Sequence, residues 1–264
     1  MQWGGDPMKL FIFKTAQEAD ACASQLVREQ LRVKEDSVFC FAGGNTTKSI
    51  HQKIAEDFCG EPEAFGHAQA FVLDEYWGVP PSDPAGVAGR LKAQILDRVG
   101  FPPENIHLFD MDAPDAEQAC RAYDRKWFAN TIDLAFLGLG ENGHLGFNEP
   151  GTAFGLTAHK VALSEETRRS KSATFGGYEK VPAFGITVGI KNILAAKHLI
   201  LAVKGPAKRE MVCRALLGAV TEQVPASALQ LHPHVTVILD EEAASGLPDR
   251  ETLWTEQSWM DIST

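Results

Sequence analysis

The sequence lacks any apolar run of about 18 residues, the length that a membrane-spanning helix needs. Residues 1–7 also lack the basic and apolar segments of a secretory signal. Membrane insertion and secretion are therefore not expected. We interpret residues 1–8 as a flexible extension, with Met8 as a candidate start.

Cysteine is sparse. The five cysteines are scattered at positions 22, 40, 59, 120 and 213, and they form no Cys-x-x-Cys pair. This pattern argues against a disulfide framework and a cysteine zinc site, and it fits reduced thiols in a cytoplasmic protein. His232 and His234 resemble a metal pair, but the sequence offers no evident third ligand, so we expect no metal.

Positive charge is in short supply as well, with 25 Lys and Arg against 35 Asp and Glu and a formal net charge of −10. Nonspecific nucleic-acid binding needs a basic face, which this acidic excess opposes. A small phosphate can still bind through a few N–H groups and one or two cations. We therefore expect no nucleic-acid partner, but a phosphorylated metabolite stays open as a ligand.

Short apolar runs alternate with amphipathic patterns along the chain. Strands are expected at 9–13, 37–41, 68–73, 106–109, 132–136, 181–189, 198–203 and 234–239. Helices are expected at 15–32, from the turn after 44 to 58, and at 87–99, 114–128 and 206–218. This alternation is typical of a doubly wound α/β fold with one mostly parallel sheet and helices on both faces. With no repeat or linker, we expect a single domain over residues 1–264, with 79–86 and 151–180 as candidate lids.

A glycine-rich loop follows the expected strand 132–136 and spans residues 137–150. Its four glycines let the backbone turn sharply and approach a ligand closely. His144 and Glu149 place two titratable side chains five residues apart, which indicates acid–base chemistry. A surface turn with a solvated histidine is the alternative, and the residues alone do not choose between them.

A second glycine-rich turn, residues 43–46, joins a strand to a helix. Such a turn presents N–H groups and the positive helix end to a phosphate, although taken alone it is more often a simple capped loop. Asp74 follows the strand 68–73, and open α/β sheets bind ligands at this end of their strands. Asp74 is therefore either a ligand-site carboxylate or a solvated acid. Lys208 lies in an expected first helical turn, where a cation is unfavourable unless an anion binds nearby.

Four segments, in this order, resemble the glucosamine-6-phosphate deaminase (isomerase) family, which is related to the 6-phosphogluconolactonases. They are 41–46, 73–76, 140–151, and 185–189 with the turn 204–208. The resemblance covers about residues 9–245. It implies a Rossmann-like fold of the deaminase type and an enzyme that converts glucosamine 6-phosphate to fructose 6-phosphate and ammonia without a cofactor.

The resemblance also implies roles for single residues. Asp74 would move a proton between C2 and C1 of the sugar, His144 would exchange a proton with the ring oxygen, and Glu149 would orient the imidazole. Asn142 stands where many members have an aspartate, so we expect a less protonated His144 and lower activity than in those members. The substrate and its phosphate would be bound by Gly43, Gly44, Asn45, Thr46, Gly140, Gly143 and Lys208.

Two positions depart from the family pattern near the phosphate. Thr47 replaces a usual proline, which allows a more flexible loop. Ala173 replaces an arginine that serves as a second phosphate cation in the family. Arg168, Arg169 and Lys171 are the basic residues close enough in sequence to substitute for it.

Several alternatives stay open. Residues 185–187 with 191–194, and 224–227, are more similar to the galactosamine-6-phosphate isomerase branch, so the C4 epimer is an alternative substrate. A 6-phosphogluconolactonase-type hydrolase and a non-catalytic sugar-phosphate-binding protein are the other two. His159 and Val161 replace a basic pair that binds an activating acetylated amino sugar phosphate in some members, so we expect no such activation. A homo-oligomer is also open, because hexameric and monomeric members share these motifs.

Overall fold

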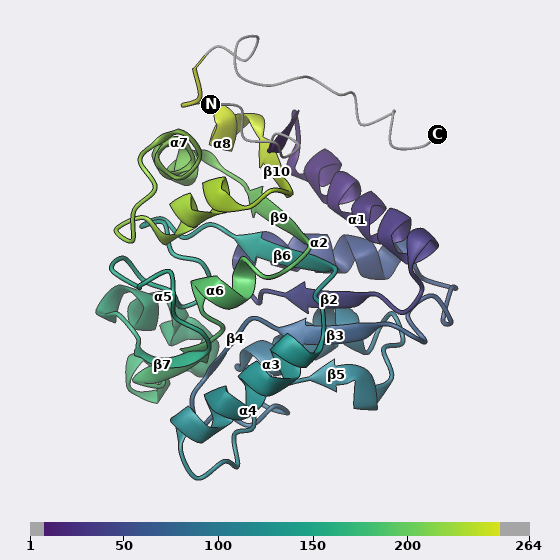
Figure 1. Ribbon diagram of the computed structural model, residues 1–264, viewed down its shortest axis with the longest axis vertical. Coiled ribbons are helices and arrows are strands. Elements are labelled where there is room, and N and C mark those ends of the chain that lie inside the picture. The colour runs from purple at the N-terminus through teal and green to yellow at the C-terminus, as the bar shows by residue number, and fades with distance from the viewer. Residues whose placement is uncertain (1–7, 249–264) are drawn as a thin grey trace.

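The computed structural model describes residues 8–248, so the expected extension lies outside them except for Met8. Within this range seven parallel strands form the main sheet in the order β1-β10-β9-β6-β2-β3-β5. Figure 1 shows them stacked from β10 near the top to β5 near the bottom. The strands are β1 (Lys9–Phe13), β2 (Val38–Phe41), β3 (Gln69–Val72), β5 (Ile106–His107), β6 (Leu134–Gly138), β9 (His198–Val203) and β10 (Val235–Asp240).

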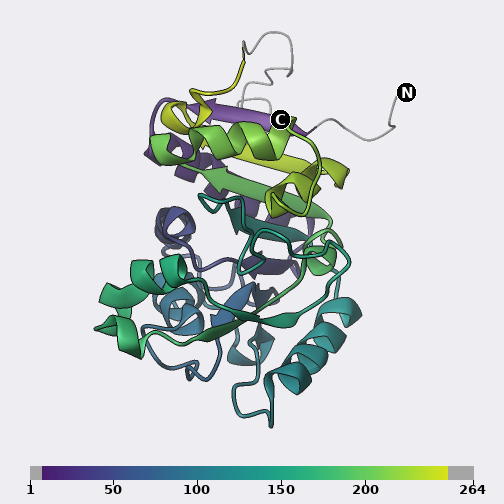
Figure 2. The same ribbon diagram turned by 90° about the vertical axis from the view of Figure 1, so that its left-hand side faces the viewer.

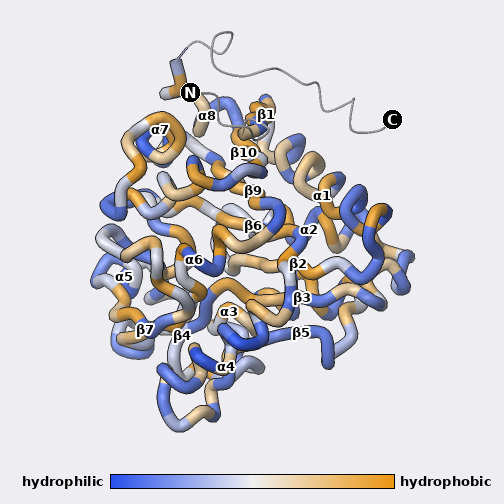
Figure 3. Tube along the Cα trace, in the orientation of Figure 1, coloured by the Kyte–Doolittle hydropathy of each residue, from blue (hydrophilic) through white to orange (hydrophobic). Residues whose placement is uncertain are grey.

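Helices cover both faces of this sheet. They are α1 (Ala16–Val33), α2 (Asn45–Asp57), α3 (Val87–Leu91), α4 (Ala116–Ala129), α6 (Ile190–Ile193), α7 (Arg209–Leu217) and α8 (Glu241–Ala244). Because successive strand residues point to opposite faces, Phe39 and Phe41 pack in one core with α1, α2 and α3, whereas Val38 and Cys40 pack in the other with α4, α6 and α7. Figure 3 shows the resulting pattern on α1, whose turns alternate between hydrophobic and hydrophilic colours. The predicted doubly wound α/β fold is confirmed.

Local signals placed several elements correctly. The Thr15 hydroxyl accepts from the Glu18 N–H at 3.2 Å and the Glu18 carboxylate accepts from the Thr15 N–H at 3.0 Å, which is the capping box expected at the start of α1. The expected helix 87–99 is divided into α3 and a π-helical turn, Lys92–Leu96. Every helix described is too short or too polar to cross a membrane.

The prediction of one sheet was wrong, because the same range contains a second, antiparallel sheet in the order β4-β8-β7. Its strands are β4 (Asp74–Tyr76), β8 (Phe184–Thr187) and β7 (His159–Ala162). The segment 181–189 therefore does not extend the main sheet. Its strand, β8, pairs instead with β4, whose first residue is Asp74.

Helix α5 (Glu165–Phe175), which was not predicted, lies inside the segment 151–180, our candidate lid. The Ser164 hydroxyl caps it by accepting from the Thr167 N–H at 3.1 Å, and Gly176 ends it at a φ of 70°. None of its residues is buried, so it lacks the one-sided apolar stripe by which a helix is recognised in a sequence. Figure 2 shows it standing to one side of the main sheet.

Candidate active site

A cavity of about 440 Å³ lies at the carboxyl ends of β2, β3, β6 and β9, where strand order reverses. Of the eleven residues predicted for the site, all but Gly143 and Glu149 line it. The nine are Gly43, Gly44, Asn45, Thr46, Asp74, Gly140, Asn142, His144 and Lys208. Segments far apart in the sequence thus meet at one edge of the sheet, as the prediction requires.

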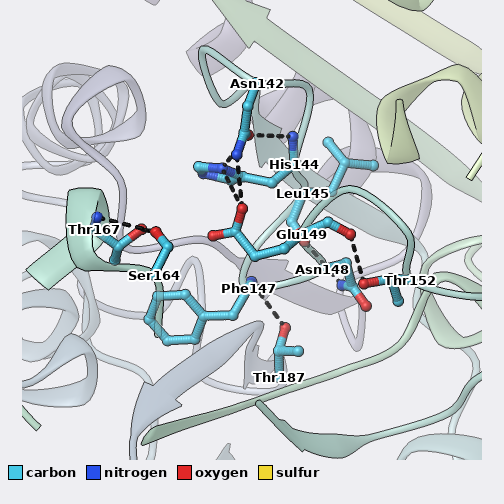
Figure 4. Close-up of polar contacts among 10 residues, drawn as sticks. All are labelled: Asn142, His144, Leu145, Phe147, Asn148, Glu149, Thr152, Ser164, Thr167 and Thr187. Carbon is cyan, nitrogen blue, oxygen red and sulfur yellow. Dashed lines mark hydrogen bonds and ion pairs between the residues drawn. The ribbon is translucent and has the colours of Figure 1, made fainter. Parts of the chain in front are cut away.

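The loop after β6 holds a chain of hydrogen bonds that Figure 4 shows in close-up. The Asn142 amide nitrogen donates to Glu149 Oε2 at 2.7 Å, and Asn142 Oδ1 lies 2.7 Å from His144 Nδ1. The direct separation of His144 Nδ1 and Glu149 Oε2 is 3.8 Å. Asn142 therefore bridges Glu149 to the imidazole, and Glu149 itself does not line the cavity.

This chain of bonds fixes the tautomer of His144. Asn142 Oδ1 also lies 3.2 Å from the backbone N–H of His144, which can only donate, so this atom is the amide oxygen. Nδ1 of the ring must then carry a proton and donate to it, which leaves the lone pair on Nε2. Burial lowers the pKa of His144, whereas the Glu149 charge raises it. Burial is the larger effect, so the pKa lies below its ordinary value and the imidazole is biased towards its neutral form.

Glycine and asparagine residues hold this loop in place. A Cβ atom on Gly140 would lie 2.3 Å from His144 Nδ1, so only glycine leaves room for the ring. Gly143 has a φ of 90° and its side-chain position faces the core, which explains why it supports the turn without lining the cavity. Asn148 is fully buried and donates to the carbonyl oxygens of Leu145 and Val188, each at 2.8 Å.

Asp74 faces the cavity from the start of β4, and its Oδ1 is a buried atom without a hydrogen-bond partner within residues 8–248. Burial, and then the neighbouring Glu75 charge, raise the pKa of Asp74 to about 7, against Arg90 and Lys171, which lower it. Such a carboxyl group can both take up and release a proton near neutral pH. It has the properties of a general base.

The adjacent Glu75 has a different, structural environment. Its carboxylate accepts from the backbone N–H groups of Tyr76, Val87 and Ala88 at 2.7, 2.9 and 2.7 Å. Two of these donors belong to the first turn of α3, so Glu75 ties β4 to that helix. Of the two neighbouring acids, only Asp74 is left free for chemistry.

The turn 43–46 leads into the N-terminus of α2, whose first N–H groups have no partner within the helix. The Thr47 hydroxyl is buried and lies 2.6 Å from the carbonyl oxygen of Ala42, so it braces the turn from within. Lys208 ends the short 3-10 turn Pro206–Lys208 before α7, and its Nζ lies 3.4 Å from Thr46 Oγ1. N–H groups and a cation thus converge on one end of the cavity, where a phosphate would fit.

Several residues that line the cavity were not predicted. Arg90 comes from α3, within the expected helix 87–99, and no motif around it marks it as functional. Helix α5 also borders the cavity and supplies Ser164, which caps it, with Glu166, Thr167, Ser170 and Lys171. Of this group the sequence named only Lys171, as one of three basic residues that could replace the arginine absent at Ala173. The others could have been found only with a prediction of α5 itself.

Comparison with known proteins agrees with this geometry. The family described as glucosamine-6-phosphate isomerases/6-phosphogluconolactonase matches residues 13–238. A glucosamine-6-phosphate deaminase from Shouchella clausii is 38% identical over 239 residues, which cover 90% of this chain and 97% of the relative. Glucosamine-6-phosphate deaminase 2 from Bacillus subtilis is 36% identical over 243 residues, covering 91% of this chain and 98% of the relative.

Solved structures show the same fold. A monomeric glucosamine-6-phosphate deaminase superimposes with a TM-score of 0.87 and 33% identity, covering 90% of this chain and 100% of its own. A 6-phosphogluconolactonase from Trypanosoma brucei superimposes with a TM-score of 0.75 over 91% of this chain and 99% of its own. At 19% identity the second likeness concerns the fold alone.

Proposed function

The chain belongs to the family of glucosamine-6-phosphate isomerases and 6-phosphogluconolactonases, and we propose that it converts glucosamine 6-phosphate and water to fructose 6-phosphate and ammonia. One observation carries the proposal. A buried carboxyl group with an unpartnered oxygen, Asp74, and a neutral imidazole with a fixed tautomer, His144, line the same cavity beside a phosphate-binding turn.

Ring opening is the first step. The C1 hydroxyl group must lose a proton and the ring oxygen must gain one, so a single group can accept the first proton and return it to the second. Nε2 of His144 carries the lone pair for this exchange, because Nδ1 donates to Asn142. Glu149 and Asn142 are positioning residues, since they hold the ring by its other nitrogen.

Isomerisation follows in the open-chain sugar. The Asp74 carboxylate removes the proton from C2, and the electron pair of that bond forms a C1–C2 double bond. At the same time the π electrons of the C1 carbonyl move to O1, which takes up a proton from water, and the product is an enolamine. Asp74 then returns its proton to C1 while the nitrogen lone pair forms the C2–N double bond, which gives a protonated imine at C2; its extra proton is released to water in the hydrolysis that follows. Water adds to this imine and ammonia leaves, so one water is consumed and one ammonia is released. A carboxyl group with a pKa near 7 suits both proton transfers at neutral pH.

The phosphate serves as a handle remote from the reacting carbons. The N-terminus of α2 with Gly43, Gly44 and Thr46, and the ammonium group of Lys208, would bind it and so position C1 and C2 against Asp74. Asn45 and Gly140 would complete the walls around the sugar, and Gly143 would support the turn from outside the cavity. None of these steps calls for a metal or a cofactor.

Location and domain structure complete the proposal. We propose one domain, because the two hydrophobic cores share the strands of a single main sheet. A cytoplasmic location is supported by the five cysteines, all of which are free thiols.

The experiment is ammonia release by the purified protein from glucosamine 6-phosphate and, in parallel, from galactosamine 6-phosphate. We expect release from the gluco sugar, with losses of about 10²- to 10⁴-fold in Asp74→Asn and His144→Ala. Release from the galacto sugar alone would assign the C4 epimer instead. Release from neither, together with hydrolysis of 6-phosphogluconolactone, would replace the proposal with a lactonase.

A further inference from the structure

Three cationic side chains line the cavity within the described chain, namely Lys208, Lys171 and Arg90. None of them forms an ion pair with a carboxylate in residues 8–248. Cations in a concave, partly dry site normally find an anionic partner, because an uncompensated charge is costly there. Their convergence therefore points to an anion that comes from outside the chain.

Arg90 is held in a fixed position beside the phosphate-binding turn. Its guanidinium group donates to the carbonyl oxygen of Ala85 and, at 3.4 Å, to that of Gly43. A guanidinium group has five N–H donors, so these two bonds leave others free. Both acceptors are neutral, so they orient the group without neutralising its charge.

Lys171 is the basic residue of α5 that reaches the cavity. Arg168 instead donates to the Tyr178 hydroxyl at 3.1 Å and to the carbonyl oxygen of Val181 at 3.2 Å. Arg169 pairs with Glu165 on the outer face of the helix. Ala173 is exposed and lies outside the cavity wall.

The surroundings of Lys171 fit an anion as the missing partner. Burial and then the Arg90 charge lower the pKa of Lys171, against the Asp74 charge, which raises it. Burial also lowers the pKa of Lys208, and Lys171 lowers it further, against the Glu141 charge, which raises it. Mutual repulsion of this kind is relieved when an anion lies among the cations. A phosphate monoester carries a charge near −2 at neutral pH and accepts several charge-assisted hydrogen bonds.

We propose that Arg90 and Lys171 bind the substrate's phosphate together with Lys208, and that this pair replaces the arginine absent at Ala173. The inference rests on the proposed function for the identity of the substrate. The inferred binding of an oxyanion by the guanidinium group of Arg90 on α3 and the ammonium group of Lys171 on α5 does not depend on which reaction follows. Neither residue belongs to the motifs by which the sequence was recognised.

The test is calorimetric binding of inorganic phosphate to the full-length protein, which needs no turnover. We expect Lys171→Ala to weaken binding about tenfold, the order of one charge-assisted hydrogen bond. Lys171→Arg, which keeps the charge, should bind within a few-fold of the parent. The matched control is Arg169→Ala on the same helix, which should leave binding unchanged. Since α5 buries none of its residues, these variants should fold.

Arg90→Lys tests the fork, because it keeps the charge but loses the planar donors, and we expect severalfold weaker binding. If ammonia is released, both Lys171→Ala and Arg90→Lys should raise KM more than they lower kcat. Parent-like phosphate binding by both variants would overturn the inference. Weakened binding in a protein that releases no ammonia would support the inference and refute the proposed function, so the two fail separately.

Discussion

Replacing Asn142 with aspartate probes how the neutral amide sets the state of His144. In the parent, Asn142 donates to Glu149 at 2.7 Å and accepts from His144 Nδ1 at 2.7 Å. Asn142→Asp keeps the acceptor but exchanges the amide donor for a second carboxylate oxygen. The change adds a negative charge beside the imidazole, so the pKa of His144 should rise.

The size of the rise follows from the separation. Two unit charges about 4 Å apart interact by about 4 kcal/mol at an effective dielectric constant of about 20, equivalent to about 3 pKa units. The new carboxylate would also oppose Glu149, and the two would share a proton part of the time, which reduces the gain. We therefore expect an increase of about 1–3 units in the pKa of His144.

The assay is an NMR titration of the imidazole signals, with a His144→Gln spectrum to identify this residue among the eight histidines. The limb of the pH–rate profile that reports His144 should move to higher pH by a similar amount. Glu149→Gln is the matched opposite, because it removes a charge that raises this pKa and should move it down. An unchanged titration and an unchanged profile in Asn142→Asp would refute the account of Asn142 as a neutral bridge.

The remaining predictions concern the loop, the phosphate turn, pH and regulation. Gly140→Ala should reduce kcat about 100-fold, because the methyl group would displace the His144 ring, and parent-like steady-state turnover would contradict this. Thr47→Val should lower the free energy of unfolding by about 1–3 kcal/mol in urea titrations, because the Ala42 carbonyl loses its buried donor; an unchanged midpoint would show that the hydroxyl does not brace the turn. The rate constant kcat/KM should rise with pH through about 7 as Asp74 ionises, whereas a flat profile would argue for another base. Rate curves should stay hyperbolic and insensitive to an acetylated amino sugar phosphate; sigmoidal, effector-sensitive curves would count against this.

The sequence patterns typical of strands predicted most of the main sheet. The apolar runs predicted all seven of its strands to within a few residues. The inner strands are buried on both faces and read as continuously hydrophobic, whereas the edge strands β1 and β5 are only partly buried. The position of the predicted catalytic and phosphate-binding turns could also be inferred from local sequence signals. Glycine-rich turns after buried strands are recognisable in the sequence, and parallel strands bring their carboxyl ends to one edge.

The small sheet and α5 could not be read in the same way. Strand β7 has no fully buried residue, and β8 was placed in the wrong sheet because an apolar run does not specify its partner. Helix α5 has no buried side chain and therefore no apolar stripe. Arg90 depends on the packing of α3, so it became visible only in three dimensions. Lys171 was one of three basic residues that the sequence offered, and its place on α5 distinguishes it from the other two.

The neighbouring acids Asp74 and Glu75 show why residue type alone does not assign a role. Successive residues of β4 point in opposite directions, so one carboxylate reaches the N-terminus of α3 and the other reaches the cavity. The three N–H groups that hold Glu75 keep a negative charge fixed beside Asp74, and that charge adds to burial in raising the Asp74 pKa to about 7. Glu75, which has a structural role, thereby helps to set the proton affinity of Asp74, the proposed base. Arg90 connects this pair to the phosphate turn, because it donates to the carbonyl oxygen of Gly43 and also lowers the pKa of Asp74. A phosphate bound beside Arg90 would therefore also change the pKa of Asp74.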